Sequence, residues 1–228
     1  MFGIDNYQTL LKNISSKGWN FSTDWEIIDK KKNILLRHDI DFSIEDALIT
    51  AEIEKKLEIK STFFFMLTSN MYNIFSSYNR NLIERIIESG HKVSVHFDPT
   101  AYTTLDSFKE EKYIFERMFN VNVDIVSIHR PGIFLENNNQ SLNGIAHTYQ
   151  DKYFKDIKYI SDSGGSDVNQ KLSEHFSSKC QSTFQLLLHP IWWTSKEKNP
   201  TSTLNKCIEN KLKFLYEETE LNCKTYKR

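Results

Sequence analysis

The chain has 228 residues, 39% of them hydrophobic and 13% aromatic, which is enough to bury a sizeable core in a single domain spanning residues 1–228. Its 29 basic and 30 acidic residues leave a formal charge of −1, which argues against a nucleic-acid partner and against binding to an anionic membrane surface. Three cysteines, an odd number without zinc-finger spacing, predict ordinary thiols rather than a disulfide framework (Cys180, Cys207 and Cys223).

The first residues, 1–6, lack the basic start and the apolar segment of a signal peptide. The longest uninterrupted apolar run, 63–67, is far too short to span a bilayer. We therefore expect a cytoplasmic protein without a membrane span.

Apolar runs alternate with amphipathic segments along most of the chain. The predicted strands lie at 33–37, 61–67, 92–96, 124–129, 157–161 and 184–189. Several are apolar at consecutive positions, as is typical of strands covered on both faces. The predicted helices run over 43–57, 80–89, 104–118 and 201–219, the first opened by a capping box at Ser43.

Strands that alternate with helices predict parallel pairing and right-handed crossovers. We expect a distorted or incomplete (β/α) barrel with parallel strands, since a full eightfold barrel usually needs more chain. A doubly wound parallel sheet is the alternative. Residues 135–155, rich in Asn, Gln and Tyr, are interpreted as a loop insertion, with or without a short helix.

Acidic and histidine side chains stand where four of the predicted strands end. The first strand leads into Arg37-His38-Asp39-Ile40-Asp41, and later strands reach His96, His129 and His189. Charged groups are costly to bury unless they are paired or bound to metal. The carboxyl ends of parallel strands meet at one edge of an α/β sheet or barrel, where catalytic sites form. This pattern predicts a metal-dependent hydrolase.

An ordered series of short motifs across residues 33–193 resembles the polysaccharide deacetylases, or family-four carbohydrate esterases. The segment with Asp39 and Asp41 stands where that family has a catalytic base and a metal ligand. The other matching motifs are Ser61-Thr62-Phe63-Phe64, Gly90-His91-Lys92-Val93-Ser94-Val95-His96, His129-Arg130-Pro131-Gly132, Ser161-Asp162-Ser163-Gly164 and Leu186-Leu187-Leu188-His189-Pro190.

The resemblance implies a role for each matching residue. His96 takes the place of a metal-ligating histidine, and Arg130 that of the arginine that holds the base. Asp162 takes the place of the acid in the fourth motif, and His189 that of the general acid. The chain departs from the family at Thr100, which stands where the metal motif His-x-x-x-His has its second histidine.

We predict Asp41 and His96 as metal ligands, with His129 as the third ligand and Asp98 as the next candidate. Imidazole and carboxylate donors suit zinc best, with nickel, cobalt or manganese as alternatives. Asp39 and Asp41 have the same strand parity, so which is base and which is ligand stays open. Arg37 shares that parity and is a second candidate partner for these acids.

The bound metal would lower the pKa of its water toward ~7 and polarise the scissile carbonyl. Asp39 would accept the water proton, with Arg130 keeping it ionised. His189, oriented by Asp162, would protonate the departing amine.

Plainer interpretations stand beside these. His38 is equally well read as a hydrogen-bonded structural histidine, Asp162 as a turn former, and Arg130-Pro131-Gly132 as loop punctuation. Trp192 and Trp193 are either core residues or an aromatic floor for a sugar ring, and we favour the floor; Asp98 is a further candidate for substrate contact.

The function that we predict is a metal-dependent amide hydrolase that removes an N-acetyl or related acyl group from an amino sugar. A small carbohydrate is the expected partner, nucleotide-linked or lipid-linked in surface-glycan synthesis, by analogy with the family. One alternative is a hydrolase of another C–N bond, such as an N-formyl group or a cyclic imide. A second is a metal-free, catalytically silent carbohydrate-binding domain, for which Thr100 is the best support. The sequence leaves the oligomeric state open.

Overall fold

The fold is described from a computed structural model, for residues 2–28, 32–132, 134, 140–177 and 182–227. In this part of the chain the strands are β1 (Asn20–Ser22), β2 (Asn33–Ile40), β3 (Thr62–Phe65), β4 (Lys92–Phe97), β5 (Ile125–Ile128), β6 (Ala146–His147), β7 (Lys158–Ser161) and β8 (Phe184–Leu187). The α-helices are α1 (Ile4–Ser16), α2 (Ile44–Lys56), α3 (Ser77–Glu88), α4 (Phe108–Phe119), α6 (Asp151–Phe154), α7 (Asn169–Ser177), α8 (Pro190–Thr194) and α9 (Pro200–Asn222). Short 3-10 turns lie at η1 (Pro99–Ala101), η2 (Leu105–Ser107) and η3 (Ser163–Gly165).

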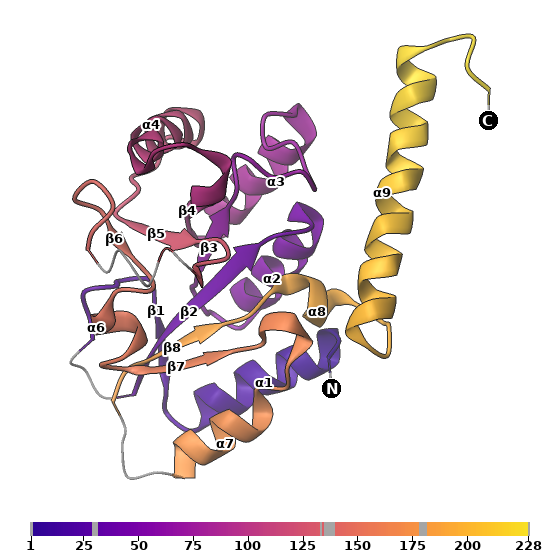
Figure 1. Cartoon of the computed structure of the whole chain (residues 1–228). Coiled ribbons are helices and arrows are strands. Elements are labelled where there is room, and N and C mark those ends of the chain that lie inside the picture. The colour runs from indigo at the N-terminus through magenta and orange to yellow at the C-terminus, as the bar shows by residue number, and fades with distance from the viewer. Residues whose placement is uncertain (1, 29–31, 133, 135–139, 178–181, 228) are drawn as a thin grey trace.

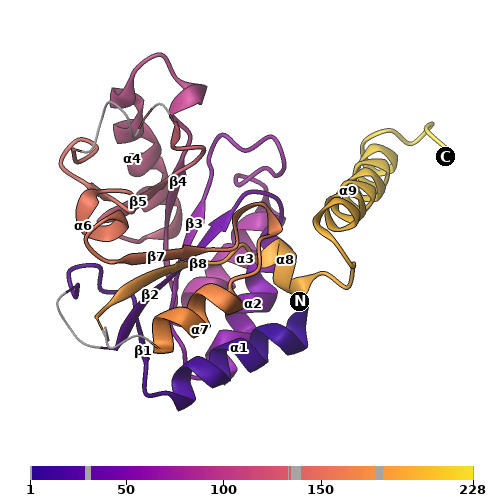
Figure 2. The same ribbon diagram turned by 60° about the horizontal axis from the view of Figure 1, so that its bottom comes forward.

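The strands form one curled sheet with helices on its outer face (Figures 1 and 2). Its strand order is β6-β5-β4-β3-β2-β8-β7, with β1 on β2, and every pair is parallel. If the sheet is followed around the barrel, β2 to β8 come in the order of the chain, with β8 next to β2. A doubly wound sheet would instead reverse its order midway. The predicted incomplete (β/α) barrel is confirmed, and its opening lies between β6 and β7.

Strand β2 carries most of the chemistry and is longer than predicted. It continues to Ile40, where the prediction ended at 37, and all eight of its residues are buried. Successive side chains of a strand point to opposite faces. Arg37 and Asp39 therefore point into the barrel, whereas His38 points outward to the helices.

The interpretation of residues 135–155 as a loop insertion is wrong for its second half. Residues 135–139 lie outside the described part of the chain, as does Cys180. Ala146 and His147 form barrel strand β6 on β5, and α6 is the short helix considered for this segment. Thr148 and Tyr149, directly after β6, bind Arg37 inside the barrel, so the polar composition of this segment suggested a loop. Helices α1, α7 and α8 were not predicted either.

Two large apolar clusters lie between the sheet and the outer helices, and a small one closes the bottom of the barrel. The small cluster centres on Trp25, whose indole N–H donates to Thr62 Oγ1 at 3.1 Å. Above this cluster the barrel interior is polar and contains Arg37, Asp39 and Ser127, which lie directly below the carboxyl ends of the strands. No helix among the described residues is both long and apolar enough to cross a membrane.

Candidate metal and catalytic site

Three potential metal ligands converge at the carboxyl ends of β2, β4 and β5. His96 Nε2 lies 3.2 Å from Asp41 Oδ1 and 3.2 Å from His129 Nδ1. His129 Nδ1 lies 3.5 Å from Asp41 Oδ1. This is the one cluster of three or more His, Cys, Asp or Glu residues with metal-binding spacing among the described residues.

These distances fit a tetrahedral zinc ion. Ligand atoms placed about 2.0–2.2 Å from such an ion are separated from one another by about 3.3–3.6 Å. Asp41 Oδ1 is buried and makes no well-formed hydrogen bond to a described residue, although two imidazole nitrogens face it. Such an orphaned oxygen is expected of a metal ligand. Three protein ligands leave one coordination position for water, as in catalytic rather than structural zinc sites.

The local fold explains how His129 reaches the site. In the β4–β5 ladder His96 pairs with Ser127, and the amide N–H of His129 donates to Phe97 O at 2.7 Å. The ladder thus continues to His129, whose side chain lies on the same face as that of Ser127 because the two are separated by one residue. Asp41 follows β2 directly. Burial alone would raise its pKa, but the imidazoles of His129 and His96 hold that pKa well below its usual value.

Asp39 is paired with Arg37 inside the barrel. Arg37 Nε donates to Asp39 Oδ1 at 2.9 Å, and Arg37 Nη2 donates to Asp39 Oδ2 at 2.6 Å. The guanidinium is fully buried. Its remaining hydrogen bonds go to side-chain oxygens on two other strands, β5 and β8, and on the β6–α6 connection: Ser127, Gln185, Thr148 and Tyr149. Burial would raise the pKa of Asp39, but Arg37 outweighs it and the pKa is lowered.

The guanidinium beside Asp39 belongs to Arg37 and not to Arg130, so the predicted pairing is corrected. Among the described residues, the ion pairs of Asp39 are with Arg37 and His96, and none is with Arg130. Two residues apart on β2, Arg37 and Asp39 share a face. Arg130 lies beyond the end of β5, exposed and in the left-handed conformation with φ of 47°.

His189 is held by Asp162 on the opposite side of the site. His189 Nδ1 lies 2.6 Å from Asp162 Oδ1, and the His189 amide donates to both carboxylate oxygens at 3.1 and 3.0 Å. Trp193 Nε1 donates to Asp162 Oδ2 at 2.8 Å. Asp162 is fully buried and makes no capping bond to its own turn, so it is not a simple turn former. Burial lowers the pKa of His189, but Asp162 outweighs it and raises that pKa to about 9.

The acid–base candidates flank the ligand cluster. Asp39 Oδ2 lies 3.8 Å from His96 Nε2, and His189 Nε2 lies 3.8 Å from Asp41 Oδ2. The side chains of Asp41, His129 and His189 are 20%, 13% and 12% exposed, whereas those of Asp39 and His96 are 3% exposed. Solvent therefore reaches the cluster from the side of Asp41, His129 and His189.

Asp98, the second candidate for third ligand, is engaged elsewhere. Its Oδ1 accepts from the Thr100 amide at 2.9 Å and from Thr100 Oγ1 at 2.6 Å, which caps η1. Trp192 and Trp193 belong to α8, are 5% and 2% exposed, and pack in the apolar cluster that also holds the buried side chains of α1. The expected aromatic floor is corrected accordingly, since neither ring presents a face to solvent.

His38 belongs to a buried polar network on the outer face of β2. Its Nε2 lies 2.7 Å from Glu54 Oε1, and its Nδ1 lies 2.9 Å from Leu188 O, one residue before His189. Glu54 also accepts from the Tyr7 hydroxyl and from Ser61 Oγ. This arrangement supports the structural interpretation of His38: the network joins α1 and α2 to the backbone that carries His189.

Sequence reasoning gave no role to the polar side chains that hold Arg37. A signal was present, because Ser127 and Gln185 interrupt the apolar runs of β5 and β8 at inward-facing positions. A polar residue amid a buried strand is costly unless something inside the barrel binds it.

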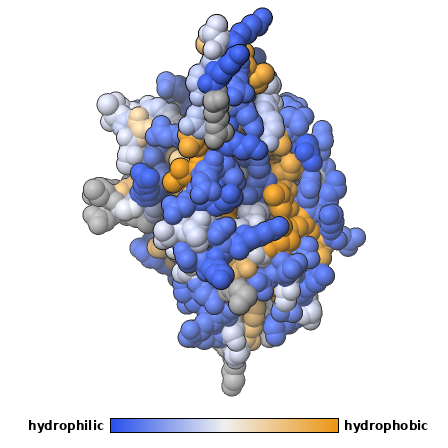
Figure 3. Space-filling model, turned by 90° about the vertical axis from the view of Figure 1, so that its right-hand side faces the viewer, coloured by the Kyte–Doolittle hydropathy of each residue, from blue (hydrophilic) through white to orange (hydrophobic). Residues whose placement is uncertain are grey.

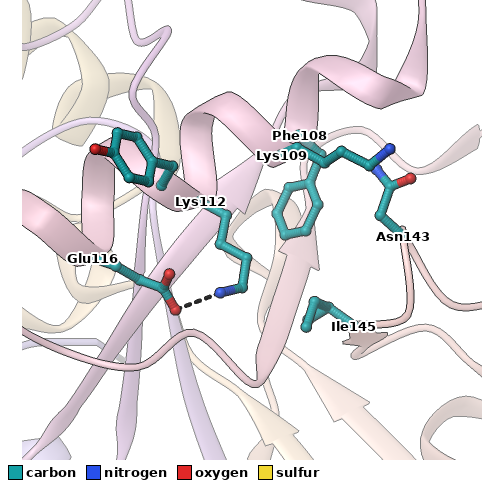
Figure 4. Close-up of a pocket in the computed structure, with 7 residues that line it drawn as sticks. Phe108, Lys109, Lys112, Glu116, Asn143 and Ile145 are labelled. Atoms are coloured by element: carbon teal, nitrogen blue, oxygen red, sulfur yellow. Dashed lines mark hydrogen bonds and ion pairs between the residues drawn. The ribbon is translucent and has the colours of Figure 1, made fainter.

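A hollow of about 260 Å³ lies elsewhere on the surface, between α4 and the segment before β6 (Figure 4). Phe108, Ile145 and the Lys112–Glu116 ion pair of 2.5 Å line it. None of the candidate site residues does.

Comparison with known proteins gives structural neighbours only. No family model matches the chain, and no curated protein does. One similar solved structure is the peptidoglycan deacetylase PdaC from Bacillus subtilis, with 16% identity, a TM-score of 0.49, and coverage of 86% of this chain and 98% of that one. The chitin deacetylase from Colletotrichum lindemuthianum has 16% identity, a TM-score of 0.47, and coverage of 78% and 81%.

A third similar structure is a mutant of a Bacillus anthracis CE4 family pseudoenzyme with restored enzymatic activity, with 16% identity and a TM-score of 0.48. The match covers 80% of this chain but 63% of that one, so the chain spans under two thirds of its length. These neighbours come from the family that the motif series resembles. The chemistry of the site is argued from its own geometry.

Proposed function

We propose that this protein is a metal-dependent amide hydrolase that removes an N-acetyl or related acyl group from an amino sugar. One observation carries the proposal: three ligand atoms lie 3.2–3.5 Å apart, with a carboxylate and an imidazolium each 3.8 Å from a member of the cluster. Hydrolysis of an amide needs these parts, namely a place to activate water, a proton acceptor and a proton donor.

Asp41, His96 and His129 would hold the divalent ion, and their one oxygen and two nitrogen donors favour zinc. When bound, the ion supplies a Lewis acid that lowers the pKa of water toward ~7 and polarises the scissile carbonyl.

Asp39 and His189 divide the proton transfers. Asp39 is kept ionised by Arg37, so it accepts the proton of the attacking water. His189 donates Nδ1–H to Asp162, which leaves Nε2–H directed toward the cluster for the departing amine. The general acid and base contribute typically about 10²–10⁴-fold in rate. The products are the free carboxylic acid and the amine of the sugar.

The amino-sugar substrate rests on the motif series, and a nucleotide-linked or lipid-linked sugar is the form that we favour. A hydrolase of N-formyl groups or cyclic imides would use the same residues. A silent carbohydrate-binding domain is less well supported. Binding of a carbohydrate does not require the proton acceptor and donor that the Asp39–Arg37 and His189–Asp162 pairs provide.

The test is metal analysis and acetate release by the full chain with free, nucleotide-linked, lipid-linked and polymeric N-acetylated amino sugars. We expect one bound divalent ion per chain. Replacing Asp41, His96 or His129 by Ala should remove both the ion and turnover. Replacing Asp39 by Asn, or His189 by Ala, should leave the ion bound and cost about 10²–10⁴-fold in rate.

Asp124→Ala provides the matched control, because Asp124 is an acid just before the opposite end of β5 and pairs with Lys92 at 2.5 Å. It should keep both metal and turnover. Absence of a stoichiometric ion would support the silent binding domain. Full turnover in Asp41→Ala or His129→Ala would refute the ligand set.

A further inference from the structure

Helix α9 extends away from the body of the protein (Figures 1 and 2). Only its first turns touch the core, through the partly buried Leu204 and Cys207. Further along, the Phe214 ring lies 6.4 Å from that of Tyr78. Figure 3 shows hydrophobic surface gathered on the side of the molecule that carries this helix. Five of its large apolar side chains are exposed: Ile208, Leu212, Phe214, Leu215 and Leu221.

Three of these side chains form a stripe with helical spacing. Ile208, Leu212 and Leu215 are separated by four and three residues and are 57%, 50% and 59% exposed. At about 100° per residue the stripe is turned about 100–160° around the helix from Phe214, which faces the body. A helix of 23 residues is about 34 Å long and marginal in water unless such a stripe is buried.

The charges of α9 are ordered along the helix. The segment 206–213 carries Lys206, Lys211 and Lys213 against a single glutamate, Glu209. The segment 217–220 that follows carries only acidic charges, at Glu217, Glu218 and Glu220. The helix macrodipole favours the reverse order, with acids near the N-terminus and bases near the C-terminus. The order therefore disfavours an isolated α9.

We propose that α9 pairs antiparallel with α9 of a second copy of this chain, around a twofold axis. This pairing brings the lysine-rich segment 206–213 of each helix toward the acidic segment 217–220 of the other and sets the two macrodipoles in opposition. A parallel pair would place like charges together. The stripe of Ile208, Leu212 and Leu215 is buried between the two helices, and such a contact is self-complementary.

One reciprocal ion pair defines the register. Lys211 and Glu218 are seven residues apart, so they lie on the same flank of the stripe and about 10.5 Å from each other along the axis. They are too far apart to pair within one helix. In the antiparallel dimer Lys211 of each copy faces Glu218 of the other. Three lysines against four glutamates give α9 no net positive charge, which argues against an anionic lipid surface as the occupant.

The test is sedimentation equilibrium of the full chain under reducing conditions from 1 to about 100 µM. We expect a monomer–dimer equilibrium that weakens as NaCl is raised, because the charges across the interface attract each other and salt screens them. Leu212→Gln/Leu215→Gln should stay monomeric throughout. Circular dichroism checks that α9 remains folded.

Charge reversal tests the direction of pairing. Lys211→Glu alone and Glu218→Lys alone should each raise the dissociation constant at least tenfold, and the chain with both changes should return to within about threefold of the original. A parallel pair would gain nothing from the double change, since each position would face itself. Lys206→Glu, turned about 120–180° from the stripe, is the matched control and should shift the constant less than threefold.

A chain that is monomeric at 100 µM would overturn the proposal. So would a dimer that tightens with salt, that survives Leu212→Gln/Leu215→Gln, or that is not restored in the double charge variant. Sedimentation of the monomer with anionic vesicles would identify a membrane surface as the occupant instead. None of these residues lies in the candidate site, so bound metal and acetate release should be unchanged in every variant, and the two proposals fail separately.

Discussion

Replacing Arg37 by Met should destabilise the protein severely and abolish turnover. Arg37 is fully buried and supplies two of the three hydrogen-bond donors that bind the Asp39 carboxylate. After the substitution Asp39, itself 3% exposed, keeps only the hydroxyl of Ser127, at 3.0 Å, as a hydrogen-bond donor. The nearest ionisable side chain left to this buried carboxylate would then be His96, at 3.8 Å.

The magnitude follows from this geometry. Removing one partner of a buried ion pair costs about 3–5 kcal/mol, because the other charge stays desolvated. For a chain of this length each kcal/mol lowers the melting temperature by about 2 °C, which gives a fall of about 6–10 °C. The double change Arg37→Met/Asp39→Asn removes both charges and should recover about 2 kcal/mol, since a poorly bonded neutral amide costs only about 1–3 kcal/mol.

Urea and thermal unfolding in the presence of a chelator measure these differences without a contribution from bound metal. Turnover, measured with metal, should be lost in both variants, because the proton acceptor that we propose is the Asp39 carboxylate with Arg37 beside it. An Arg37→Met protein within 1 kcal/mol of the original would refute the reasoning. A double variant in which the two losses simply add would refute it equally, because it would show that the two side chains do not interact.

Three further predictions concern other buried groups. Burial raises the pKa of Glu111 to about 7, against the favourable hydrogen bond from Tyr102, so the folded state binds this proton more tightly and stability falls as pH rises from about 4.5 to 7. Glu111→Gln should therefore gain about 2–3 kcal/mol relative to the original chain between pH 5 and pH 8, as measured by urea unfolding at each pH. Asp162→Asn should lower the pKa of His189 from about 9 by at least about one unit, as measured by NMR titration of the metal-free chain, because the carboxylate raises it. Trp193→Phe removes the indole donor to Asp162 and should cost about 1–3 kcal/mol with the fold retained, as measured by thermal unfolding and circular dichroism.

The general architecture could be predicted because its signals are local. Strand β2 appears in the sequence as an apolar run, and α2 is capped by Ser43, whose Oγ accepts from the Asp46 amide at 3.1 Å. The alternation of strands and helices predicts parallel pairing. The position of a site at the carboxyl ends of strands follows from that topology. The elements that were missed have weak signals: β6 is two residues long and sits in a polar segment.

The partners of individual site residues were harder to predict, because they depend on which face a side chain takes. The family motif pointed to Arg130 as the partner of Asp39, whereas strand parity alone pointed to Arg37, and the fold follows parity. Trp193 shows the same limit. A tryptophan after a catalytic histidine suits a sugar floor, but α8 turns this ring inward onto Asp162.

At Thr100 the number of metal ligands expected from the sequence motif differs from the number that the folded structure brings together. A His-x-x-x-His motif takes two ligands from one segment, and with threonine at the second position a count along the sequence finds a ligand missing. In a parallel barrel, however, the neighbouring strand ends at the same edge, and the register of His96 with Ser127 carries His129 to within 3.2 Å of His96. Thr100, which stands at the position of the second histidine, has a structural role instead, because it donates to Asp98 and closes the turn after β4. A ligand set in such a barrel is therefore better sought across adjacent strand ends than within a single motif.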